Sequence, residues 1–180
     1  MGGVTAPFLV AALVGWFLPR DHRVTRAVTL RLGPQTVWET VANLDRLPSW
    51  WLMVRSVERL PDVAGRTRYR QTFANKRGRD EPVELEVAKT NPPMRLVTRI
   101  TDERSSFQGR WTYAIEPAGP GSRVSVTEEG TIRNPLVRFF FRTMMSKTFF
   151  VDSYLRALGQ KFGETVEPRS SPAVVHEEIV

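Results

Sequence analysis

The feature that most constrains the fold is a series of segments between residues 54 and 132 in which apolar and polar residues alternate. Successive side chains of a β-strand point to opposite faces, so this period of two predicts strands with one buried face. Short turn-like separators such as Asn91-Pro92-Pro93 favour antiparallel neighbours over crossovers through helices. The predicted strands are Val54–Leu60, Arg66–Phe73, Val83–Thr90, Arg95–Ile100, Phe107–Glu116 and Ser122–Ile132.

Another strand and helical patterns flank this series. Val24–Leu32 alternates as a first strand, and Gly33-Pro34 ends it before a short helix. Asn43–Trp51 forms a second short helical or turn segment. After Asn134-Pro135, which suit a helix start, apolar residues recur at about 3.6 positions from Leu136 to about Phe162 and predict one long helix.

The order of these elements predicts an α+β fold class. The expected architecture is a seven-stranded curled antiparallel sheet with two short helices after the first strand. The long C-terminal helix is the one large element left to cover the concave face. We expect three parts: an apolar N-terminal segment over residues 1–19, a folded domain over 20–163, and a flexible tail over 164–180.

The N-terminal segment has no charged residue from Met1 to Leu18. A helix of that length would measure about 27 Å, just short of a bilayer's apolar core of about 30 Å. We predict a membrane anchor, with the domain facing the cytoplasm because Arg20, Arg23 and Arg26 follow the segment directly. A secretory signal, or an apolar segment packed on protein in a soluble cytoplasmic domain, are the alternatives.

The charge balance suggests an anionic partner, since 26 Lys+Arg against 19 Asp+Glu give a net charge of +7, and a compositional habit of the source genome is the alternative. Arg66–Arg79 holds six cations and no acid, but Arg66, Arg68 and Arg70 alternate away from Tyr69. A nucleic-acid surface needs arginines and aromatics together, so we expect no nucleic acid and a possible contact of this stripe with a membrane. An ordinary solvated face is the alternative.

The chain resembles a known family, the START-like, polyketide cyclase/dehydrase and lipid-transport superfamily (SRPBCC), which has the helix-grip fold. The resemblance covers residues 23 to about 163, and it is closest to bacterial members with an apolar N-terminal segment before a Leu-Pro-Arg-Asp-His-Arg stretch, here Leu18–Arg23. It implies a hydrophobic cavity between the sheet and the C-terminal helix. The motifs that carry it are Val28–Pro34, Val37-Trp38, Asn43–Trp51, Phe107–Trp111, Gly121–Val124, Glu128–Gly130, Asn134-Pro135 and Tyr154–Leu158.

Glu128 is the ionisable residue that alternation directs inward, because it shares a face with Val124, Val126 and Ile132. It is the catalytic candidate, and the alternatives are that a bulge near Gly130 turns it outward or that it pairs with an arginine at the rim of the sheet. The two histidines, His22 and His176, are expected outside any cavity.

The absence of cysteine and of metal-ligand spacing predicts no metal and no cofactor. The predicted cavity residues share an inner face or the helical stripe. Besides Glu128 they are Trp50, Trp51, Tyr69, Phe73, Phe107, Gly109, Trp111, Tyr113, Phe140, Met144, Val151 and Tyr154.

These patterns predict a domain that binds or carries an apolar or amphipathic small molecule, lipid or polyketide-like. A cyclase or dehydratase that uses Glu128 and a tyrosine in the same cavity is the second hypothesis. A structural or interaction module whose interior is filled by its own side chains is the third. The alternative at each aromatic position is a residue of an ordinary hydrophobic core that lines no cavity. Trp50 and Trp51 either frame an entrance to the cavity or seal the end of the sheet. The sequence leaves the oligomeric state open.

Overall fold

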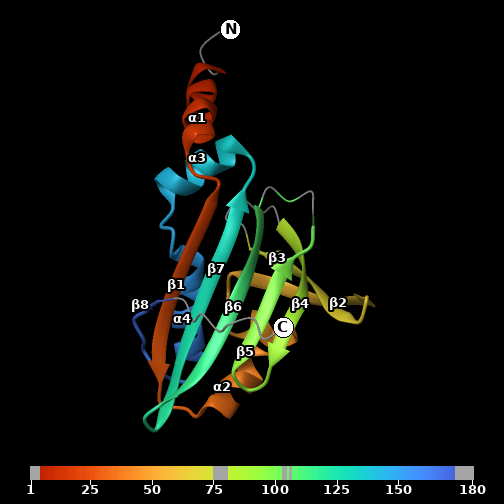
Figure 1. Cartoon of the computed structure of the whole chain (residues 1–180), viewed down its shortest axis with the longest axis vertical. Coiled ribbons are helices and arrows are strands. Elements are labelled where there is room, and N and C mark those ends of the chain that lie inside the picture. Colours follow the sequence, from red (N-terminus) through yellow and green to blue (C-terminus); the bar gives the residue numbers. More distant parts are fainter. Residues whose placement is uncertain (1–4, 75–80, 103–104, 106, 173–180) are drawn as a thin grey trace.

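The computed structural model describes residues 5–74, 81–102, 105 and 107–172 (Figure 1). Within these residues, eight strands form one antiparallel sheet in the spatial order β2-β3-β4-β5-β6-β7-β1-β8. The strands are β1 (Asp21–Leu30), β2 (Val54–Val63), β3 (Arg66–Phe73), β4 (Glu81–Asn91), β5 (Arg95–Ile100), β6 (Phe107–Ala118), β7 (Gly121–Ile132) and β8 (Arg169–Ser170). The helices are α1 (Thr5–Phe17), α2 (Pro34–Val41), the 3-10 helix η1 (Leu44–Ser49), α3 (Pro135–Met144) and α4 (Phe149–Lys161).

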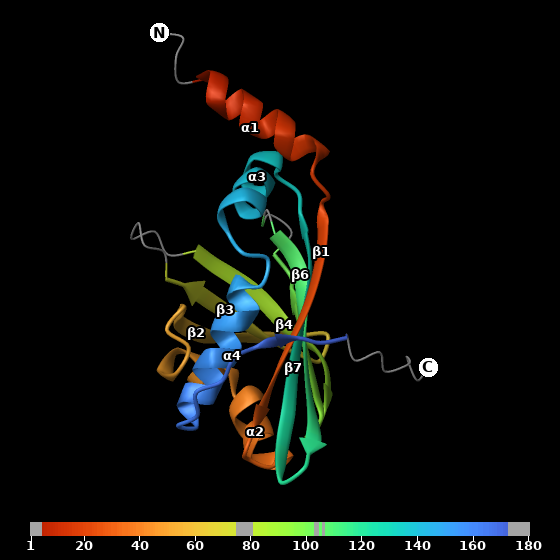
Figure 2. The same cartoon turned by 90° about the vertical axis from the view of Figure 1, so that its left-hand side faces the viewer.

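The predicted α+β helix-grip architecture is confirmed. Figure 2 shows the sheet curling so that its inner face surrounds α4, while α1 extends from the opposite end of the molecule to α2. The strands β2 to β7 follow one another in space as they do along the chain, as the short separators predict.

The sheet has eight strands rather than the predicted seven. Arg169 and Ser170 pair with Ala27 and Arg26 of β1, inside the segment expected to be a flexible tail. The Arg26 side chain donates to the Pro168 carbonyl (2.6 Å) and to Ser170 Oγ (2.9 Å). These contacts order the segment through a residue far away in the sequence, which a local pattern of turn-forming residues cannot reveal. Residues 173–180, with His176, lie outside the described part.

The prediction of one long helix over Leu136–Phe162 is wrong, because the structure has two helices there, α3 and α4. Asn134 caps α3 as expected, accepting hydrogen bonds from the amides of Leu136 (2.9 Å) and Val137 (3.2 Å). Met145 is extended (φ −120°, ψ 142°) and ends α3. Ser146 Oγ then accepts a bond from the Thr148 amide (3.3 Å), a local alternative to helical bonding.

The core lies between the inner face of the sheet and α4. Val124 and Val126 of β7 and Val151, Leu155 and Leu158 of α4 have no exposed surface. The strand β7 alternates its apolar residues inward and α4 repeats them on one side, so the two patterns meet in a single cluster.

The helix α1 lies at one end of the molecule, where it packs against α3 (Figure 1). It begins at Thr5 and ends at Phe17, so it covers most of the predicted apolar segment. Among the described residues, no helix is both long and apolar enough to cross a membrane.

Candidate ligand-binding site

Aromatic side chains fill the space between the sheet and α4, and Tyr154 lies at their centre with 1% of its surface exposed. Its ring centroid lies 5.2 Å from that of Trp50, 5.3 Å from Trp51, 5.8 Å from Trp111 and 5.4 Å from Tyr113. Most of these pairs are edge-to-face, a favoured geometry for aromatic contacts. The structure thus brings together five of the residues that the sequence predicts for the cavity.

Three elements position these rings. The 3-10 helix η1 ends at Ser49 and delivers Trp50 and Trp51 to the inner face. Trp51 is fixed further by a hydrogen bond from its Nε1 to Ser153 Oγ of α4 (2.9 Å). Trp111 and Tyr113 are two residues apart on β6 and therefore point to the same side of the sheet.

The cluster continues along β3. Phe73 contacts Trp51 (6.0 Å between centroids) and Phe150 of α4 (6.5 Å), and Tyr69 is buried on the same face of β3. Burial raises the pKa of Tyr69, and the charge of Asp45 adds to the shift.

The tyrosine hydroxyls at the centre of the cluster remain protonated. Burial raises the pKa of Tyr113 strongly, a hydrogen bond with Thr98 opposes this shift, and the Glu128 charge adds to it. Burial also raises the pKa of Tyr154, with a further contribution from Tyr113. Both hydroxyls therefore act as neutral hydrogen-bonding groups, not as bases.

Trp50 contributes a hydrogen-bond donor without a described partner to this aromatic cluster. Its Nε1 is buried and has no hydrogen-bond partner among the described residues. A buried donor without a partner costs about 1–3 kcal/mol, which an acceptor group of a bound molecule would recover.

Glu128 points inward, as strand parity predicts, and only 4% of its surface is exposed. It pairs across the sheet with Trp111 and with Val24. In the described part of the chain, the one group within ion-pairing distance of its carboxyl is the His22 imidazole, at 3.6 Å. A carboxyl group buried on an aromatic face is an unusual feature, because burial of such a group is costly.

The expectation that His22 lies outside any cavity is wrong. The His22 ring lies over Gly130, where a Cβ atom would come within 2.6 Å of it, and it contacts Phe107 (5.6 Å between centroids). The strand β1 starts at Asp21, earlier than predicted, so His22 shares the inward parity of Val24 and Val28. That parity was the signal in the sequence that could have found it.

A small cavity of about 20 Å³ lies beside Glu128 at the connection between α3 and α4. This volume is enough for about one water molecule. Two cationic side chains, Arg142 and Lys147, contribute to its wall together with the carboxyl group. The lining residues are His22, Glu128, Ile132, Phe141, Arg142, Ser146, Lys147 and Phe150.

A larger hollow of about 970 Å³ lies along the ends of β1, β5, β6 and β7. Charged and polar side chains dominate its lining, including Arg23 and Arg110, which both pair with Glu129 (3.4 and 2.5 Å). The pKa of Glu129 is held below its usual range by the hydrogen bond from Arg110 and by both arginine charges. This hollow therefore suits an apolar molecule less well than the aromatic face does.

Four predicted cavity residues lie elsewhere or contribute differently. Phe140 is on α3, 40% exposed, and Phe107 lies at the far end of β6 beside His22. A Cβ on Gly109 would lie 2.5 Å from the Glu129 carbonyl, so this glycine permits close strand approach and does not open a void. Met144 ends α3, and its side chain lies outside the described part.

The basic stripe predicted over Arg66–Arg79 is largely neutralised where it is described. Arg66 pairs with Glu86 (2.7 Å) and Arg68 with Glu84 (2.9 Å). Arg70 reaches both Glu84 (2.9 Å) and Glu58 (3.0 Å). Lys76, Arg77 and Arg79 lie outside the described residues.

Within the described residues, no three acidic or histidine side chains come close enough to hold a metal ion. The chemistry of the inner face therefore rests on aromatic rings, two neutral hydroxyls and the Glu128–His22 pair.

Solved structures with the same fold include proteins of several kinds. The Zhui aromatase/cyclase from a Streptomyces species superposes with a TM-score of 0.65 at 14% identity, covering 77% of this chain and 91% of that one. A START superfamily protein from Mycobacterium smegmatis gives 0.58 at 16% identity, covering 78% and 99%. The di-domain aromatase/cyclase BexL gives 0.64 at 15% identity, covering 81% of this chain and 51% of that one. A comparison with curated protein sequences finds no match.

Fold and inner face together define a helix-grip domain. The profile of the polyketide cyclase/dehydrase and lipid transport family matches residues 21–161, and the chain belongs to this family.

Proposed function

We propose that this domain binds or carries an apolar or amphipathic small molecule, lipid or polyketide-like, between the inner face of the sheet and α4. The family and the aromatic lining support this function. The observation that carries it furthest is Glu128, a buried carboxyl group on the aromatic face that lines a small cavity and has His22 within ion-pairing distance. A ligand hydroxyl that reaches this cavity would donate a hydrogen bond to the Glu128 carboxyl group.

Binding requires movement, because the rings around Tyr154 are in contact with one another. The extended Met145 separates α4 from α3, so α4 can shift without bending a continuous helix. The cavity beside Glu128 adjoins this connection. It marks the end of the space between the sheet and α4 (the grip) at which a ligand would begin to separate α4 from the sheet.

The 3.6 Å approach of His22 to Glu128 supports a second function, the cyclase or dehydratase activity. An imidazole beside a carboxyl group is able to accept and return a proton when a substrate hydroxyl is close. The same cavity would then hold a substrate that reacts, whereas in the first function it holds a molecule that is bound or carried unchanged.

The test is a comparison of two fluorescent amphiphiles of equal chain length, one ending in an alcohol and the other in a carboxylate. The alcohol should bind the full chain about tenfold more tightly, because it donates to Glu128 whereas a carboxylate places a second acid beside it. Glu128→Gln should reduce the difference to about twofold. Glu129→Gln, next in sequence but on the opposite face, should leave it unchanged. Equal affinity for both probes in the unmodified chain would contradict the role of Glu128.

We also propose that the domain works at a membrane, on the cytoplasmic side, through the apolar segment Met1–Leu18. The exposed apolar surface of α1 supports this placement. Arg26 does not contribute, since it pairs with Asp152 (2.7 Å) inside the domain. The stripe at Arg66, Arg68 and Arg70 contributes little, because its charges are paired with glutamates.

A further inference from the structure

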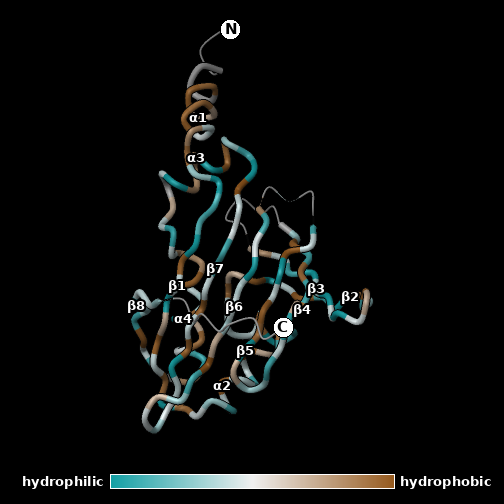
Figure 3. Tube along the Cα trace, in the orientation of Figure 1, coloured by the Kyte–Doolittle hydropathy of each residue, from teal (hydrophilic) through white to brown (hydrophobic). Residues whose placement is uncertain are grey.

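The outer surface of α1 is a large apolar area without a described partner. Trp16 and Phe17 are 63% and 81% exposed, and Leu9, Val10 and Leu13 are exposed to a similar degree. Figure 3 shows α1 as an almost continuous apolar stretch at the end of the molecule. Exposed apolar areas of this kind mark sites of contact with a membrane or another protein.

The helix α1 is nevertheless fixed to the domain and does not hang from it. Ala11 and Gly15, one turn apart, are buried against α3. A Cβ atom added to Gly15 would lie 1.9 Å from the Pro135 carbonyl oxygen, so the two helices approach as closely as glycine allows. We call the pair α1 and α3 the α1–α3 platform.

Two arginines of α3 hold the segment that joins α1 to β1. Arg138, 1% exposed, donates to the Leu18 carbonyl (2.9 Å) and also to those of Ile132 and Arg133. Arg142 donates to the carbonyls of Pro19 (3.1 Å) and Asp21 (2.9 Å). These bonds set the direction in which α1 leaves the domain.

The exposed apolar side chains of α1 are able to enter the apolar part of a bilayer. The 13 described residues of α1 extend about 20 Å, against an apolar core of about 30 Å. Insertion would remove the exposed surface of Leu13, Trp16 and Phe17 from water.

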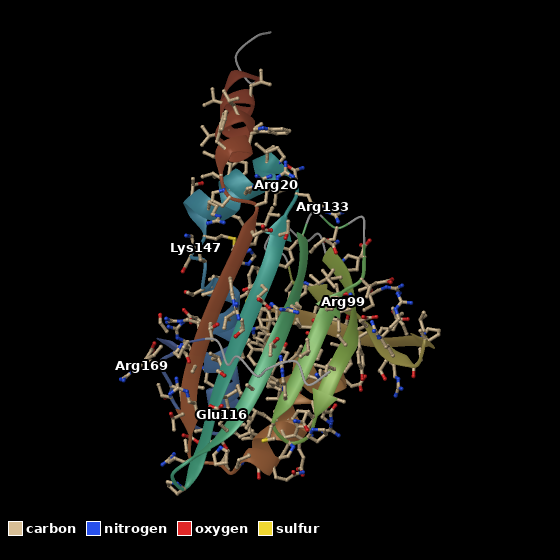
Figure 4. The ribbon with its side chains drawn as sticks, viewed as in Figure 1. Arg20, Arg99, Glu116, Arg133, Lys147 and Arg169 are labelled. Atoms are coloured by element: carbon tan, nitrogen blue, oxygen red, sulfur yellow. The ribbon has the colours of Figure 1, made fainter. Side chains whose placement is uncertain are left out.

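The charges around the base of α1 favour an anionic surface. Figure 4 places Arg20, Arg133 and Lys147 at the end of the molecule that carries α1 and α3. The segment Met1–Leu18 contains no acidic residue. The nearby Asp21 carboxylate accepts a hydrogen bond from Thr131 Oγ1 (2.6 Å). Basic side chains beside a buried apolar element are the arrangement that anionic phospholipid headgroups attract.

We propose that the α1–α3 platform is a rigid docking surface for an anionic phospholipid bilayer. This deepens the proposed membrane association and rests on it. Arg142, Ser146 and Lys147 line the cavity beside Glu128, so docking brings the end of the grip with that cavity to the headgroups. An apolar ligand then exchanges with the bilayer at the connection between α3 and α4.

The experiment is flotation of the full chain with vesicles of phosphatidylcholine alone or mixed with phosphatidylserine. The unmodified chain should bind the mixed vesicles at least about tenfold more tightly, and added salt should remove the difference. Arg20→Gln combined with Lys147→Gln should lose the preference. Leu13→Ser combined with Trp16→Ser should lose binding to both kinds of vesicle, while Leu52→Ser, also at a highly exposed apolar position, should change nothing.

Three outcomes would overturn the proposal. The first is no binding to either vesicle, and the second is binding that survives Leu13→Ser with Trp16→Ser. The third is a lipid-independent dimer that the same pair of changes dissolves, because a second copy of the chain would then cover α1. Uptake of the fluorescent alcohol by the Leu13→Ser, Trp16→Ser chain separates these failures from failure of the binding function, since neither residue lies in the grip.

Discussion

Replacing Tyr154 by alanine is expected to lower the free energy of unfolding by about 3–5 kcal/mol, the range for loss of a fully buried aromatic ring. The ring is in contact with Trp50 and Trp51, which follow η1, and with Trp111 and Tyr113 of β6. The backbone holds these partners in separate places, so they cannot close the space together. The loss therefore combines the removed ring with the cavity it leaves.

Equilibrium urea unfolding followed by far-ultraviolet circular dichroism measures this loss. Tyr154→Phe keeps the ring and should cost only about 1 kcal/mol. Phe149→Ala removes a ring that is 45% exposed on the same helix and should cost less than about 1 kcal/mol. A loss below about 1 kcal/mol for Tyr154→Ala would show that the rings do not pack as a unit.

Replacing Arg138 by methionine is expected to cost about 3 kcal/mol or more, because three carbonyls, of which that of Ile132 is buried, lose their donor at once. Each nitrogen of the guanidinium group donates to one carbonyl: Nε to Ile132 (3.1 Å), Nη1 to Leu18 (2.9 Å) and Nη2 to Arg133 (3.0 Å). Methionine fills much of the same volume but supplies no hydrogen.

Urea unfolding together with amide hydrogen exchange tests this result. Exchange in α1 should accelerate along with the loss of stability, since Arg138 holds the segment after that helix. Arg142→Met is the matched control on the same face of α3. Water can replace its bonds to Pro19 and Asp21, which are more exposed, so it should cost about 1 kcal/mol at most. An unchanged stability for Arg138→Met would mean that desolvation of the buried cation cancels its hydrogen bonds.

The strands could be predicted because their signal is local. Alternation gave the bounds of β3 and β5 without error, and parity alone put Glu128 on the inner face. The residues that line the grip, such as Trp111 and Tyr154, followed from the same periods of two and 3.6.

What the sequence did not reveal depends on contacts between distant residues. The break at Met145 lies inside an apolar repeat that continues through it, and β8 pairs with β1 where Arg26 donates to Pro168 and Ser170. The neutral character of the Arg66–Arg70 stripe follows from the register of β3 against β4, which no single-strand pattern contains. The close packing of Gly15 on Pro135 is hidden for the same reason.

The central claim is that the space between the sheet and α4 takes up an apolar small molecule. Native mass spectrometry of the purified full chain, before and after incubation with the fluorescent alcohol, tests it most directly. We expect a one-to-one complex with the alcohol, or a retained small molecule that the alcohol displaces, and a weaker complex after Trp111→Ala. A chain that shows only its own mass under both conditions would contradict the claim and leave a domain whose interior is filled by its own aromatic side chains.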